Sequence, residues 1–91
     1  MSQGSANEPL PVSFTALIIS LAGSAMMHLG EAPNPATGER SVNLALARNT
    51  IDLLAMLKEK TAGNLDEEET KLLEAMLYEL RTKFVAAKGS T

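Results

Sequence analysis

The sequence of 91 residues contains no cysteine and only three aromatic residues, Phe14, Tyr78 and Phe84. The absence of cysteine excludes disulfide bonds and thiolate chemistry, and it is compatible with a reducing compartment. Because 45% of the residues are nevertheless hydrophobic, the core must be built from Leu, Ile, Met and Ala. Such a core favours packed helices over a sheet, since strands are enriched in aromatic and β-branched residues.

The sequence also lacks a basic block. Eight Lys and Arg residues are set against eleven Asp and Glu residues, which gives a net charge of -3. The basic residues are interleaved with acids, whereas a nucleic-acid-binding protein needs a concentrated basic face to neutralise phosphates. We therefore expect no nucleic-acid partner.

The most informative absence is that of charge between residues 12 and 30, where there is no Asp, Glu, Lys or Arg. The pattern predicts a helix over residues 14–29 that is apolar almost all round. In so small a protein such a helix has to be covered by a partner subunit, a membrane or another protein.

Helix-start and helix-stop signals divide the chain into three helices. Each predicted start follows a side chain that can cap it: Ser13, Asn43, and Asp66 with Glu69 as a capping box. Gly30 is the predicted left-handed stop of the first helix. The helices are expected over residues 14–29, 44–61 and 67–86.

The predicted domain organisation is a disordered tail over residues 1–12, a three-helix domain over residues 13–86 and a frayed end over residues 87–91. The link at residues 62–65 is so short that the second and third helices should form an antiparallel hairpin. The first helix should pack on this hairpin or on a partner subunit. The fold class is therefore all-α.

Small residues in the first helix, such as Ser20, Gly23 and Ser24, would let two helix backbones approach closely. The contact could be within the chain or between two copies, and both readings stay open. If it is between copies, symmetric dimers are the commonest closed assembly, so we expect a homo-oligomer, with a dimer favoured. The predicted oligomer or partner interface consists of Phe14, Leu17, Ile18, Ser20, Leu21, Gly23, Ser24 and Met27.

Reactive groups are sparse. His28 is the only histidine, with Ser24 one turn before it and Glu31 just after it. Chance produces such spacing often, and a histidine near a helix C-terminus suits the negative end of the helix dipole. A zinc site would need three or four ligands at short spacing. We therefore expect no catalytic residue, no metal site, no cofactor and no enzymatic activity.

A membrane role for the first helix remains an alternative. The apolar run is about the minimum length for a span, but it contains Ser20, Ser24 and His28, and no basic residue closely flanks it to fix an orientation. The preceding segment has no Lys or Arg, unlike the start of a signal peptide. A buried helix in a cytoplasmic protein is the favoured interpretation, attachment to a membrane through this helix is the second, and an enzyme of unknown reaction is the third.

Several short motifs together resemble a known family. They are His28-Leu29-Gly30, Asn34-Pro35-Ala36-Thr37-Gly38-Glu39, Thr50-Ile51-Asp52-Leu53-Leu54, Glu59-Lys60-Thr61-Ala62-Gly63-Asn64-Leu65 and Leu77-Tyr78-Glu79-Leu80-Arg81. This string is similar to that of a family of short bacterial proteins, the domain of unknown function eighteen forty-four. The resemblance implies a small, all-helical bacterial protein with no assigned activity, and it carries over no catalytic residue. The expected role is that of a self-associating interaction or structural protein.

Overall fold

The computed structural model describes residues 12–89, and these form three α-helices: α1 (Phe14–His28), α2 (Leu44–Lys60) and α3 (Glu67–Gly89). The all-α prediction with three helices is confirmed. The tail expected over residues 1–12 lies outside the described residues except for Val12, and so do the last two residues of the chain.

The predicted caps form at all three helix starts. The hydroxyl of Ser13 accepts a hydrogen bond from the amide three residues on at 3.0 Å, and the side chain of Asn43 does the same at 3.1 Å. At α3 the capping box is reciprocal: Asp66 accepts from the amide of Glu69 at 2.8 Å, and Glu69 accepts from the amide of Asp66 at 3.0 Å. These bonds satisfy amides that have no partner within the helix, which fixes where each helix begins.

Gly30 ends α1 in the left-handed conformation, with φ of +79°. The amide of Gly30 donates to the carbonyl of Met27 at 3.1 Å, and the amide of Glu31 donates to the carbonyl of Met26 at 2.9 Å. This pair of bonds is the Schellman motif, which closes a helix by satisfying its last carbonyls. A β-carbon at Gly30 would lie 2.9 Å from the side chain of Val42, so both the backbone angle and the space require glycine.

The end of α3 differs from the prediction. The helix continues to Gly89, three residues beyond the expected end at residue 86. Phe84 and Ala87 pack against the core, and α3 contains no proline and no glycine before Gly89. Packing of the last turns against the core therefore extends the helix beyond the end that local sequence signals predict.

The core consists of one stripe from each helix. On α1 the stripe follows spacings of four, three and four residues, which places its members on one face. The buried hydrophobic residues are Ile18, Ala22, Ala25, Leu29, Ala47, Ile51, Leu54, Leu73, Leu77 and Leu80. Because all three pairs of helices are in contact, the core lies on the central axis between them.

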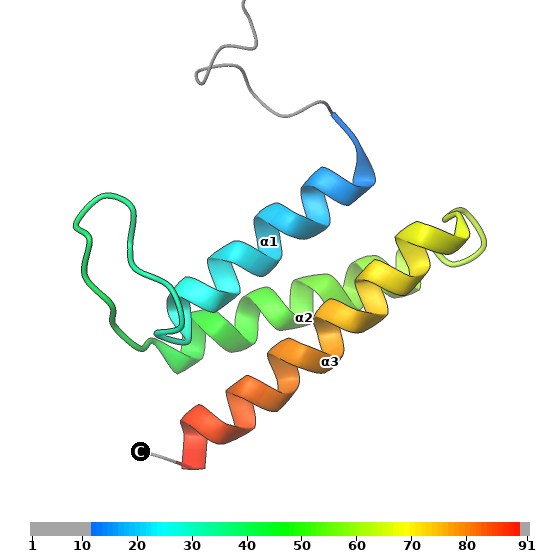
Figure 1. Ribbon diagram of the computed structural model, residues 1–91. Coiled ribbons are helices and arrows are strands. Elements are labelled where there is room, and N and C mark those ends of the chain that lie inside the picture. Colours follow the sequence, from blue (N-terminus) through cyan, green and yellow to red (C-terminus); the bar gives the residue numbers. More distant parts are fainter. Residues whose placement is uncertain (1–11, 90–91) are drawn as a thin grey trace, which may run out of the picture.

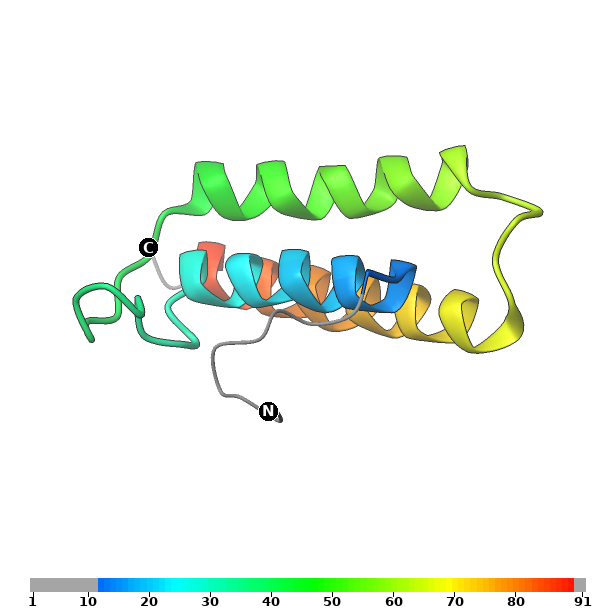
Figure 2. The same ribbon diagram turned by 90° about the horizontal axis from the view of Figure 1, so that it is seen from above.

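The three helices run side by side in alternating directions. In Figure 1, α1 and α3 run the same way and α2 runs against both. Figure 2 shows α2 on one side of the molecule and α1 with α3 on the other. Residues 29–43 connect α1 to α2 at one end, and residues 61–66 connect α2 to α3 at the other (Figure 1).

Candidate interaction surface on the first two helices

The helix α1 has one buried face and one exposed face, although the sequence is uncharged on both. Ile18 and Ala25 are completely buried in the core. On the opposite face Ser20 and Gly23 are exposed, and a β-carbon built on Gly23 would meet no atom within 4 Å. The small-residue side of α1 therefore makes no close contact within its own chain.

The predicted interface residues fall on both faces. Ile18 has no exposed surface, and Phe14 and Leu21 pack against the core while half-buried. These three side chains serve the fold of the single chain. The other five predicted residues retain exposed surface, and they are Leu17, Ser20, Gly23, Ser24 and Met27. The structure does not test the interface itself, which stays a prediction for all eight residues.

Leu17 and Ile19 border this exposed face. The side chain of Leu17 is 42% exposed and that of Ile19 is 51% exposed. Ile19 is not among the predicted interface residues, because the sequence of an apolar helix does not show which of its faces is buried and which is exposed. Among the described residues of α1 no charged Asp, Glu, Lys or Arg interrupts the face.

The helix α2 adds further exposed apolar residues that are not among the predicted interface residues, and Lys60 lies on the same side of the helix. Leu46, Leu53 and Met56 are exposed by 46%, 39% and 42%, and their spacings of seven and three place them on one side of α2. Arg48 and Asp52 lie on the other side of α2, where it borders α3. Since α2 packs on α1 and α3 only, the leucine side borders α1.

A signal for this extension is present in the sequence. The apolar sector of residues 44–57 is wider than the four positions that become buried on α2, which are Ala47, Thr50, Ile51 and Leu54. The surplus apolar residues mark surface that the chain does not cover by itself. We give the name α1–α2 face to the exposed residues Leu17, Ser20, Gly23, Leu46, Leu53 and Met56 together with the half-buried Ser24 and Met27.

His28 has no arrangement around it that resembles a catalytic site. Its side chain is half-buried and, within residues 12–89, takes part in no hydrogen bond or ion pair with Ser24 or Glu31. The carboxylate of Glu31 is instead engaged by the ammonium group of Lys83 at 3.3 Å. This ion pair ties the residue after the α1 stop to α3.

Neither a cluster of metal ligands nor a membrane-spanning helix occurs in the described part of the chain. No group of three or more His, Cys, Asp or Glu residues there is placed to hold a metal ion. No helix between residues 12 and 89 has the length and apolar character needed to cross a membrane.

Residues 12–89 therefore form a small three-helix protein in which apolar side chains of α1 and α2 remain exposed. The chain belongs to the family described as a domain of unknown function (DUF1844), which matches residues 11–86. The family expected from the motifs is thus confirmed. No curated protein and no solved structure matches the chain.

Proposed function

We propose that the protein is a self-associating interaction or structural protein, not an enzyme, and that two copies pair through the α1–α2 face. The observation that supports this most directly is the exposed side of Gly23, around which no atom of the same chain lies within 4 Å of a β-carbon position. A small-residue face that is open in the monomer is suited to close approach by another helix.

A second copy is the partner that suits this surface best. The α1 part of the face has no charged group to select a charged partner, so its binding energy has to come from apolar contact and close packing. In a two-fold dimer the same patch is used by both subunits. Leu17 of one copy would then pack near the small residues of the other.

Pairing would also remove an exposed patch that is costly to leave in water. Leu17, Leu46, Leu53 and Met56 expose between 39% and 46% of their surface, and burial of apolar surface contributes roughly 25 cal/mol per Å². Contiguous exposed apolar patches of this kind mark interaction sites on soluble domains.

The experiment is sedimentation velocity on the full chain and on two matched glutamate variants. Leu17→Glu places a charge inside the proposed interface, whereas Val85→Glu places one at an exposed apolar position of α3, 68% exposed, that the interface does not include. We expect a dimer for the wild type and for Val85→Glu, and a monomer for Leu17→Glu.

Circular dichroism on each variant shows whether the helices are retained, so a loss of dimer is not confused with unfolding. If the wild type is a monomer at low micromolar concentration, or if a folded Leu17→Glu variant remains dimeric, the proposal is wrong.

A further inference from the structure

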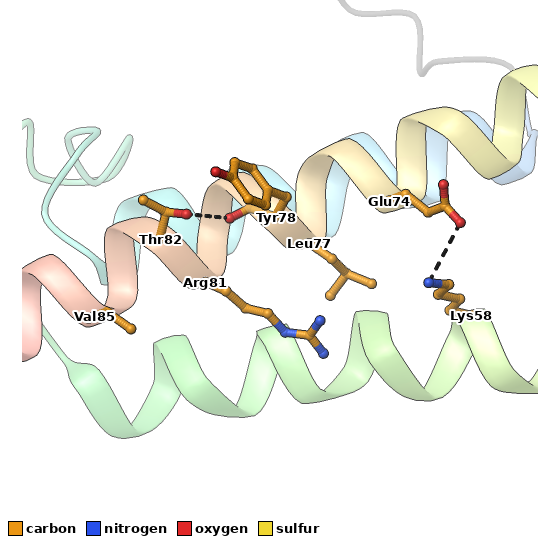
Figure 3. A pocket seen from close by; sticks show the side chains of 7 residues that line it. All are labelled: Lys58, Glu74, Leu77, Tyr78, Arg81, Thr82 and Val85. Atoms are coloured by element: carbon orange, nitrogen blue, oxygen red, sulfur yellow. Dashed lines mark hydrogen bonds and ion pairs between the residues drawn. The ribbon is translucent and has the colours of Figure 1, made fainter.

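A groove runs between α2 and α3 on the face of the molecule away from α1. In Figure 3 the ribbon of α1 lies behind α3, and the groove opens toward the viewer. It consists of three adjoining hollows with volumes of about 490, 420 and 390 Å³. Arg81 lines all three of them and extends from α3 toward α2 (Figure 3).

Two arginines of the groove form no ion pair within the described part of the chain. Among residues 12–89, neither Arg81 nor Arg48 takes part in an ion pair or a side-chain hydrogen bond. Glu74, by contrast, is engaged by Lys58 at 3.7 Å (Figure 3). A guanidinium group keeps its charge at all physiological pH values and presents paired donors that match a carboxylate.

Apolar side chains line the groove beside these charges. Leu77 lies at its floor, 3% exposed, while Tyr78 and Val85 are 76% and 68% exposed at its edge. Ala55 of α2 lines the adjoining hollow. Tyrosine and arginine are enriched among the residues that contribute most of the binding energy at protein interfaces. Here an exposed tyrosine and an unpaired arginine line the same hollow.

We propose that this groove binds an amphipathic helix of a partner protein that carries carboxylates beside its apolar face. The lining of α3 extends from Glu74 to Lys88, which corresponds to roughly 22 Å or about four turns of helix. A partner helix of that length would place leucine-like side chains over Leu77 and Val85 and a carboxylate on Arg81. Helix-in-groove recognition of this kind reads side chains at spacings of three, four and seven.

The charges of the groove favour a peptide over a nucleic acid. Asp52, Glu59 and Glu74 also line it, and they would repel a continuous run of phosphates. A helix can offer isolated carboxylates to Arg81 and Arg48 and can keep them away from these acids. The mixed lining therefore favours one position of the partner helix along the groove, as well as a partner with carboxylates.

This binding site does not depend on the proposed dimer. The groove is lined by residues on the α3 side of α2, such as Arg48 and Asp52, whereas the α1–α2 face uses Leu46, Leu53 and Met56 of the same helix. A dimer formed through that face would leave two grooves open, so that one assembly could hold two partner helices.

The test starts from a displayed library of random 15-residue peptides selected on the wild-type chain, with counter-selection on the Arg81→Glu variant. We expect enriched sequences with Asp or Glu beside apolar residues at helical spacing. The best peptide is then labelled with a fluorophore, and its affinity for the full chain is measured by fluorescence anisotropy at about 0.15 M salt, where exposed charges are screened as in the cell.

Three neutralising variants distinguish the groove from general charge. Arg81→Gln should weaken binding by about ten- to a hundredfold, because the variant loses a hydrogen-bonded charge pair with the peptide. Arg48→Gln should weaken binding by a smaller factor. Arg40→Gln, which removes the same charge from the exposed loop at residues 30–43, should change the affinity less than twofold.

Several results would overturn the proposal. They are a failure of the library to enrich acidic amphipathic sequences, equal affinity for the wild type and a folded Arg81→Gln variant, and equal weakening by Arg40→Gln. Binding of single-stranded RNA or of anionic phosphatidylserine vesicles through Arg81 in place of the peptide would also exclude it.

Discussion

Substitution of Gly23 separates the stability of the single chain from the stability of the proposed dimer. Gly23 lies in the interior of α1 with ordinary helical backbone angles, and a β-carbon there meets nothing within 4 Å in its own chain. Glycine in a helix interior costs about 1 kcal/mol relative to alanine. In the monomer, Gly23→Ala should therefore raise the free energy of unfolding by about that amount.

The dimer should respond in the opposite direction to a larger side chain. If α1 of a second copy approaches Gly23 closely, Gly23→Leu overpacks the interface at a cost of about 1–3 kcal/mol. That cost corresponds to a roughly 5- to 150-fold increase in the dissociation constant of the dimer. In the monomer the same leucine meets no steric obstacle, and its better helix propensity should stabilise the fold.

Two assays measure these effects independently. Urea unfolding at a protein concentration below the dissociation constant gives the stability of the monomer, and sedimentation equilibrium gives the dissociation constant. In thermal unfolding of the monomer, the same gain of about 1 kcal/mol should raise Tm by about 4–8 °C for a domain of this size. If Gly23→Leu stabilises the chain but leaves the dissociation constant unchanged, Gly23 faces solvent and the small-residue interface is refuted.

Three further substitutions test the fold, each by urea unfolding with circular dichroism. Gly30→Ala should destabilise by at least 1–2 kcal/mol, because the position has φ of +79° and the new methyl group would lie 2.9 Å from Val42, and an unchanged stability would contradict the stop assigned to α1. Asp66→Ala should cost about 1 kcal/mol through the lost capping box, whereas no change would show that α3 begins without it. Leu54→Ala removes a side chain with no exposed surface and should cost about 2–5 kcal/mol, and a cost below 1 kcal/mol would mean that this part of the core is not packed as described.

Local chemistry made the helix starts predictable from the sequence. Ser13, Asn43 and the pair Asp66 and Glu69 each cap the helix that they were expected to cap, because capping depends only on residues within one turn. The end of α3 was less predictable, since packing of Phe84 and Ala87 against the core extends the helix to Gly89.

The orientation of α1 could not be predicted for a different physical reason. Helical periodicity identifies an inside face by the charges on the outside face, and α1 has no such charges. Ile18 and Leu17 were therefore indistinguishable in sequence, although one is completely buried and the other is 42% exposed. The groove beside Arg81 depends on how α2 and α3 pack together, so it could not be predicted from the sequence.

Self-association is tested most directly by the molar mass of the full chain in solution. Light scattering coupled to size-exclusion chromatography at low micromolar concentration should give twice the 9.7 kDa mass of the chain. The doubled mass should persist in Val85→Glu and should fall to that of one chain in a folded Leu17→Glu variant. A mass of 9.7 kDa for the wild type at that concentration would contradict pairing through the α1–α2 face.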